Sequence, residues 1–417
     1  MRSLAGFLCC FAVLAASATG AGSTVSGRVT DARTGAGIGG ASIVSGNQRA
    51  LSDNTGHFQI DASGGSYFVR APGYRAVERP ASRTSEDGER VQLSSFMPKA
   101  LYLSVYGIGS AKLRNAALSL AHHGYINAMV IDVKGDRGSV PYPSQIALVK
   151  EDGARAITTI PDLAGLVKEL HANGIYAIAR IVVFKDTPLA TFRPDLAVKY
   201  ANGRLFRDRE GLSWTDPFSS EVRNYNTNIA VEAARAGFDE VQFDYVRFPD
   251  TSGELRFSEA ISEASRTGAI DEFLSQARHA LAPFNVYLSV DIFGYVCWNT
   301  NDTGIGQKLE DISGYVDYIC PMLYPSCFQC GIPGYPNPVS HPYQIVHNTL
   351  ANAEARLHAP PRHFRPWLQA FKDYAFDHRV FDAEEIDQQI KAAADIGTDG
   401  WMLWNPRNVY DGFRPEP

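Results

Sequence analysis

Eight apolar runs rich in β-branched residues follow one another after Pro98, and amphipathic stretches separate them. Strands that alternate with helices predict a parallel sheet built from βα units. Eight such units over residues 99–410 fit a TIM (β/α)8 barrel of the α/β class. An open doubly wound sheet is the alternative, although no Gly-rich phosphate loop follows any run. The expected strands are Leu101–Tyr106, Ala128–Val133, Ile175–Val183, Glu240–Asp244, Val286–Asp291, Val316–Met322, Arg365–Ala370 and Gly400–Trp404.

The segment before the barrel, residues 23–95, has a different sequence pattern. Short alternating runs bounded by Gly, Asn and Asp predict a small all-β sandwich. The expected strands are Val25–Thr30, Ala41–Val44, His57–Ile60, Ser66–Ala71 and Val91–Leu93. The strings Gly27-Arg28-Val29-Thr30-Asp31 and Ser52-Asp53-Asn54-Thr55-Gly56-His57-Phe58 resemble the carboxypeptidase regulatory-like domain. That resemblance implies an accessory module without a catalytic role.

The first 18 residues have the form of a secretory signal peptide. A positive charge at Arg2 precedes an apolar run from Leu4 to Ala16, and Ala16-Ser17-Ala18 has the A-x-A form of a cleavage site. The run is shorter than the roughly 20 residues of a membrane span, and no second candidate span follows. We therefore expect an exported protein, periplasmic or extracellular, that is cleaved near Ala18. With 39 Lys and Arg against 45 Asp and Glu, the chain offers no basic surface for nucleic acid.

Acidic and aromatic residues gather where the expected barrel strands end. Barrel enzymes place their active sites at these carboxyl ends. Asp244 ends the fourth strand, and its spacing from Gln242 and Glu240 puts all three on one side of that strand. If Val241 and Phe243 pack outward, Gln242 and Asp244 face the barrel axis, where a carboxylate needs a charge partner or a chemical role.

Asp291 closes the next strand on the same rim. Paired carboxyl groups that flank a bond are what glycoside hydrolysis requires: one is protonated to assist the leaving oxygen, and the other acts as nucleophile or as base for water. The sequence leaves open whether the anomeric configuration is retained or inverted.

Three segments together resemble an uncharacterised bacterial glycosyl hydrolase family, over roughly residues 100–410. They are Gly237–Pro249, Asp291-Ile292-Phe293-Gly294-Tyr295 and Asp317–Pro325. The resemblance implies a glycosidase-type TIM barrel and sugar chemistry. A weaker likeness to chitinase-type barrels places Val246 where their essential Glu stands, and Pro325 where their Asp stands. By similarity to amylase-type barrels, Asp244 is assigned as nucleophile or base and Asp291 as acid.

Other polar and aromatic residues at these strand ends are candidates for contacts with a carbohydrate substrate. Cations can bind an acidic sugar or hold a carboxylate ionised, and aromatic faces can stack on sugar rings. The candidates are Asp132, Lys134, Arg180, Trp214, Asp216, Gln242, Tyr245, Arg247, Tyr295, Tyr324, Gln369 and Trp404. Core packing is the alternative, first of all for Trp404 and for Trp367.

Four cysteines remain beyond the signal peptide, near the fifth and sixth strands. Cys327 and Cys330 form a C-x-x-C pair, but no second pair or suitably spaced histidines suggest zinc. We expect a disulfide from Cys297 to Cys327 or Cys330, as suits an exported protein, and neither a metal nor a cofactor. Two other functions remain open: a non-catalytic carbohydrate-binding barrel and a metal-dependent polysaccharide deacetylase.

Overall fold

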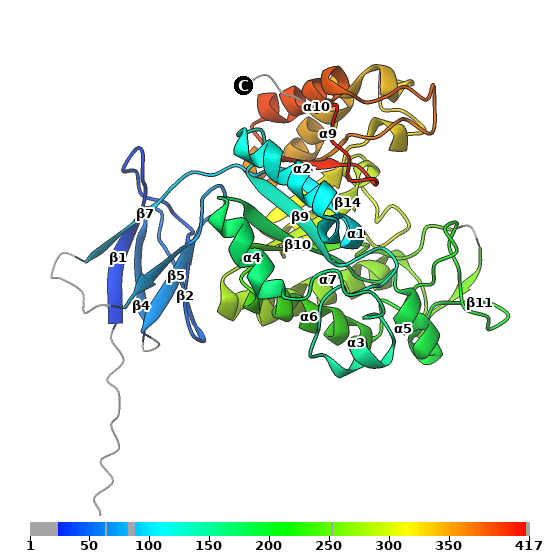
Figure 1. Cartoon of the computed structure of the whole chain (residues 1–417), viewed down its shortest axis with the longest axis horizontal. Coiled ribbons are helices and arrows are strands. Elements are labelled where there is room, and N and C mark those ends of the chain that lie inside the picture. The colour runs from blue at the N-terminus through cyan, green and yellow to red at the C-terminus, as the bar shows by residue number, and fades with distance from the viewer. Residues whose placement is uncertain (1–23, 63–64, 82–87, 252, 414–417) are drawn as a thin grey trace, which may run out of the picture.

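A computed structural model describes residues 24–62, 65–81, 88–251 and 253–413. Within them, eight parallel strands close into a barrel in the order β10-β12-β14-β15-β16-β17-β8-β9 (Figure 1). The predicted TIM barrel is therefore confirmed. The strands are β8 (Lys99–Leu103), β9 (Ala128–Lys134), β10 (Tyr176–Val182), β12 (Glu240–Asp244), β14 (Tyr287–Phe293), β15 (Tyr318–Met322), β16 (Trp367–Gln369) and β17 (Trp401–Trp404).

Helices cover the outside of the barrel because the strands turn apolar side chains outward. In β12, Val241 and Phe243 are fully buried in the core between strands and helices, and the Phe243 ring packs on Phe273 of α7 at 4.9 Å between centroids. The helices are α1 (Val105–Gly109), α2 (Ala111–His122), α3 (Ala147–Glu151), α4 (Leu163–Ala172), α5 (Thr187–Phe192), α6 (Ser220–Arg235), α7 (Glu263–Leu281), α8 (Leu309–Ser313), α9 (Pro342–Leu357) and α10 (Ala383–Ile396). None of the described helices is long and apolar enough to cross a membrane.

The barrel interior holds a buried network of charges beside apolar side chains such as Val130, Ile178 and Met402. Arg365 donates to Glu240 at 2.6 Å and to Asp399 at 2.9 Å, and all three side chains are buried. Ser289 and Tyr176 also donate to Glu240, at 2.6 and 3.0 Å. Because each charge is paired and hydrogen-bonded, the interior tolerates ions that would otherwise be costly to bury.

The N-terminal part is all-β, as predicted. One sheet has the order β4-β1-β7 and the other β3-β2-β5-β6. Their strands are β1 (Thr24–Asp31), β2 (Ser42–Ser45), β3 (Gln48–Leu51), β4 (His57–Asp61), β5 (Ser66–Arg70), β6 (Val77–Pro80) and β7 (Glu89–Leu93). The sequence analysis missed β3 and β6. Both are edge strands with largely exposed side chains, so they lack the alternation that marks a strand with one buried face.

This all-β part packs against the N-terminal ends of the barrel strands, on the side opposite the substrate face of such barrels (Figure 1). Tyr287 donates from its hydroxyl to the carbonyls of Ala71 and Tyr74 at 2.8 and 2.7 Å. The hydroxyl of Tyr318 accepts from the Gly73 N–H at 3.0 Å. Since these tyrosines begin β14 and β15, the sandwich closes that end of the barrel.

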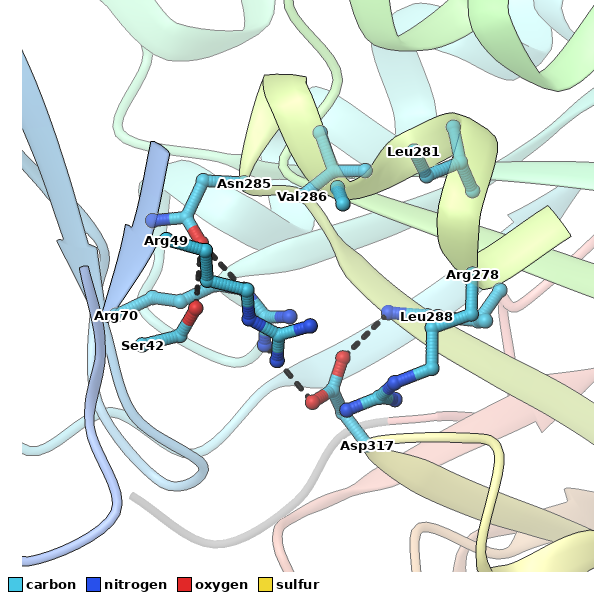
Figure 2. A pocket seen from close by; sticks show the side chains of 10 residues that line it. Ser42, Arg49, Arg70, Arg278, Leu281, Asn285, Val286, Leu288 and Asp317 are labelled. Atoms are coloured by element: carbon cyan, nitrogen blue, oxygen red, sulfur yellow. Dashed lines mark hydrogen bonds and ion pairs between the residues drawn. The ribbon is translucent and has the colours of Figure 1, made fainter. Parts of the chain in front are cut away.

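An ion pair between Arg70 and Asp317 lies at the centre of this junction (Figure 2). The two charged groups are 2.8 Å apart, and both side chains are at least nine-tenths buried. Arg70 also donates to Asn285, which accepts from Ser42 as well. Burial alone would raise the pKa of Asp317, but Arg70, with Arg278 and the Leu288 N–H, outweighs it, and the pKa lies below the usual value.

Replacing Arg70 with Met should destabilise the protein by about 3–5 kcal/mol near pH 7, because Asp317 would stay buried without its partner. The lowered pKa of Asp317 contributes stability above the unfolded pKa of about 3.9, and this contribution disappears as the pH falls through the folded value. The difference in the free energy of unfolding between wild type and R70M, measured in urea, should therefore become smaller at acidic pH.

The control is R193M, which removes an exposed pair with Asp195 and should leave the unfolding midpoint nearly unchanged. An R70M variant as stable as R193M at neutral pH would contradict the role given to the Arg70–Asp317 pair.

Candidate active site

A cavity of about 660 Å³ opens at the C-terminal ends of the barrel strands. Asp244 and Asp291 both line it, so the structure brings the two predicted catalytic residues together. Phe243 of β12 pairs with Val290 of β14, and the next residue of each strand is the aspartate. Neighbouring strands lie about 4.8 Å apart, and alternation turns both aspartates inward.

The carboxylate of Asp244 is held by a cation and by the backbone. Arg180 of β10 donates to Oδ2 from Nε at 3.1 Å and from Nη2 at 2.5 Å. The Tyr245 N–H donates to Oδ1 at 2.6 Å. Asp244 keeps 6% of its surface exposed, toward the cavity. One oxygen of Asp244 is therefore held by a cation and the other by the backbone.

Arg180 binds two further aspartates. Its Nη1 donates to Asp132 at 2.6 Å, and its Nη2 donates to Asp136 at 2.8 Å. Asp132 lies directly opposite Arg180 in the pairing of β9 with β10 and also accepts from Tyr102 at 2.7 Å. Burial raises the pKa of Asp132 to about 6, although Arg180 lowers it. Asp132 thus orients Arg180 from behind and does not line the cavity itself.

Asp291 has the opposite environment. It is 1% exposed and receives one hydrogen bond, from the indole Nε1 of Trp367 at 2.7 Å. Burial and the charge of Asp244 raise its pKa well above the usual value, and Arg180 and Trp367 only partly offset this. Asp244 is therefore paired with a cation, whereas burial raises the pKa of its neighbour Asp291.

The chain turns sharply straight after Asp244. Tyr245 has a φ of 51°, in the left-handed region that residues other than Gly and Asn seldom adopt. Backbone bonds from Val183 to the Asp244 carbonyl and from Phe184 to the Tyr245 carbonyl hold this turn. The strain coincides with the site, as is common where a fold fixes a reacting group.

Six of the predicted substrate-contact residues line the cavity. They come from five strand ends or the turns after them, and four of them are aromatic. They are Arg180, Tyr245, Arg247, Tyr295, Tyr324 and Trp404. Trp404 stacks on Tyr102 at 3.9 Å between centroids and lies under the Arg180 guanidinium.

The other predicted contacts lie elsewhere. Lys134 is fully buried behind β9 and pairs with Asp186 at 2.7 Å. Gln242 lies deeper in the barrel and donates to the sulfur atoms of Cys320 and Met402. Gln369 holds the backbone N–H of Ser326.

Two predicted contacts belong to the long excursion that follows β10. Asp216 accepts from the N–H groups of Phe218 and Ser258 and so fastens this excursion. Trp214 is 2% exposed and borders an adjoining cavity of about 450 Å³, where its ring meets Tyr245. Strand-end position alone does not distinguish such supporting residues from residues that face a cavity.

The structure contradicts the expected disulfide. Cys297, Cys320, Cys327 and Cys330 are all free in the structure. Cys297 is fully buried in the apolar core, in the turn η3 (Gly294–Cys297), whereas Cys327 contacts the Tyr374 hydroxyl at 3.2 Å and Cys330 is exposed. The cysteines lie in loops that follow neighbouring strands, but the sequence does not show that Cys297 points into the core.

Several residues of the cavity were missed by the sequence analysis. Asp136 follows β9 by two residues and was visible in the sequence, but its bond to Arg180 depends on the fold. Trp367 was attributed to core packing, yet it lines the cavity and binds Asp291. Arg209, Asp250 and Tyr374 come from long loops, whose course no periodic pattern predicts. Among the described residues, no group of three or more His, Cys, Asp or Glu is arranged to hold a metal ion.

Comparison with solved structures finds a similar fold in a glycoside hydrolase domain. The glycoside hydrolase domain of PgaB (BpsB) from Bordetella bronchiseptica is 14% identical, with a TM-score of 0.55 over 75% of this chain and 95% of that one. A hypothetical protein from Ruminiclostridium thermocellum is 40% identical over 46% of this chain and 96% of its own, with a TM-score of 0.41. The α-galactosidase TtGalA from Thermus thermophilus is 14% identical over 88% and 73% of the two chains, with a TM-score of 0.46.

No curated protein matched the chain. A family model described as "putative glycosyl hydrolase domain" matches residues 100–410, which is the whole barrel. The chain therefore belongs to this glycosyl hydrolase family.

Proposed function

We propose that the chain hydrolyses a glycosidic bond of a polysaccharide or oligosaccharide with Asp291 as acid and Asp244 as nucleophile or base. The observation that carries this proposal is the contrast between two adjacent carboxyl groups in one cavity. Asp244 is bound by a guanidinium, and Asp291 is buried without a cation at hydrogen-bond distance. Carboxyl groups whose environments differ in this way divide the roles of acid and base between them.

The steps follow from this contrast. Asp291 gives its proton to the oxygen that links the sugar to the leaving group, so that this oxygen departs as a hydroxyl. Asp244 removes a proton from the water that attacks the sugar carbon, or attacks this carbon itself. In the second case a water molecule, which gives its proton to the Asp291 carboxylate, hydrolyses the resulting glycosyl ester and releases Asp244. Arg180 pairs with Asp244 and orients it, while Asp132 and Asp136 orient Arg180.

The cavity supports a sugar ligand. Its volume of about 660 Å³ is in the usual range for small-molecule sites, and its walls include Tyr245, Tyr324, Trp367 and Trp404. Flat aromatic faces beside carboxyl groups suit a sugar ring, which has apolar faces and a polar edge. The signal-peptide pattern lies outside the described residues, and it supports an exported location, with a substrate outside the cytoplasm.

Asp244→Asn and Asp291→Asn should each lower kcat by at least about 100- to 10,000-fold, because each removes a group that transfers a proton or attacks the sugar. Hydrolysis is measured as reducing ends released from a glycan panel, and folding is checked by thermal unfolding. The control is Asp239→Asn, just before the opposite end of β12, where the side chain binds the Ala177 N–H. Full activity in both catalytic variants would refute the assignment, and saturable glycan binding without turnover in wild type would favour a binding barrel.

The pH dependence of kcat/KM should have an alkaline limb set by Asp291, since activity requires its proton and its pKa is raised well above the usual value. The Trp367 hydrogen bond lowers this pKa. Trp367→Phe should therefore move the alkaline limb to higher pH. A second variant, Trp401→Phe, changes a buried Trp of β17 that packs on Phe413, and should leave the limb in place. An alkaline limb unmoved in W367F would argue against Asp291 as the acid.

A further inference from the structure

Arg247 differs from the other buried arginines of the described chain. Five arginines are buried there, and four of them pair with an Asp or Glu within 4.0 Å: Arg70, Arg180, Arg223 and Arg365. Arg247 is 8% exposed, and no carboxylate of the described residues lies within that distance of it. Its one hydrogen bond to a described residue runs from Nη1 to the Phe248 carbonyl at 3.1 Å.

Aromatic rings hold the Arg247 guanidinium in place without satisfying its donors. The rings of Phe293, Trp214 and Tyr245 lie 4.5, 4.8 and 4.9 Å from the guanidinium carbon. Burial lowers the pKa of Arg247, although Tyr245 and the carboxylates of Asp244, Asp250 and Asp208, none within ion-pair distance, oppose this. An unpaired charge in such a place is costly unless a partner arrives from outside.

The free donors of Arg247 reach the substrate space. Arg247 lines both the main cavity and the adjoining cavity under the excursion, so it stands between them. Asp244 is already bound by Arg180, and Glu210, which borders the adjoining cavity, is bound by Lys185 at 2.9 Å. Arg209, an exposed arginine with no bonded partner in the described chain, lines the same two cavities. Asp250, also exposed, has no ion pair with either arginine.

We propose that Arg247 binds an anionic group, a uronate carboxylate or a sulfate ester, on the sugar next to the bond that is cleaved. This rests on the proposed function and narrows the substrate to charged glycans. The planar guanidinium offers parallel N–H groups that match the oxygens of either anion, and a neutral hydroxyl would leave the buried charge uncompensated. The surrounding rings would fix the guanidinium plane against which the anion docks.

The test is titration of the full chain with glucuronate, glucose 6-sulfate and glucose at constant ionic strength, followed by tryptophan fluorescence. Trp214, Trp367 and Trp404 border the two cavities and report on occupancy. Wild type should bind at least one anion about 10- to 100-fold more tightly than glucose, the range that follows from hydrogen bonds to a charged group. The two anions distinguish a uronate from a sulfated substrate.

Arg247→Gln should abolish this preference. Arg247→Lys, which keeps the charge but not the planar fork, should retain part of the preference. This variant provides the test if the Gln variant does not fold. The matched control is Arg75→Gln, since Arg75 also stacks on a ring, Phe96 at 3.8 Å, and donates to a carbonyl, but at the opposite end of the barrel. A wild type without preference for either anion, or a preference that survives in both Arg247 variants, overturns the proposal.

The result is separable from the proposed function. An anion preference in a protein without hydrolytic activity refutes the catalytic proposal and leaves Arg247 as an anion-binding residue. Hydrolysis that depends on Asp244 and Asp291, with no anion preference, refutes the role of Arg247 alone.

Discussion

The bonds of Arg180 are the constraint on which the site depends. One buried guanidinium from β10 binds aspartates that follow or end β9 and β12, and so ties three neighbouring strands together at their carboxyl ends. The arrangement leaves Asp244 with a cation and Asp291 without one at bonding distance. Because charges in a low-dielectric interior act strongly on one another, the pKa of the unpaired Asp291 is raised well above the usual value.

Arginines also neutralise buried carboxylates elsewhere along the barrel axis. Arg365 compensates Glu240 and Asp399 in the interior, and Arg70 compensates Asp317 where the sandwich closes the other end. Each of these arginines is matched within the protein, whereas Arg247 is not. Arg247 lines the same cavity as the proposed catalytic carboxyl groups, which is why we assign its partner to the substrate.

Sequence reasoning predicted the barrel because strand and helix periods are local properties of the chain. It also predicted that Asp244 faces inward, because Val241 and Phe243 had to pack against helices. It missed β3 and β6, whose exposed edges carry no apolar alternation. The supporting residues Lys134 and Gln242 were taken for substrate contacts. Gln242 lies deep in the barrel, a depth that alternation does not encode, and Lys134 bonds to Asn226 of the outer helix α6. Arg209 and Tyr374 escaped notice since loops bring them to the cavity, and the inward position of Cys297 removed the expected disulfide.

The division of roles between the two aspartates can be measured directly by carboxyl ¹³C NMR titration of the full chain, with resonances assigned through D291N and D244N. The account predicts that the Asp291 resonance titrates well above the usual value of about 3.9, and that D244N lowers its midpoint by removing a neighbouring negative charge. An Asp291 that titrates at or below the usual value, and does not respond to D244N, would contradict its role as the acid.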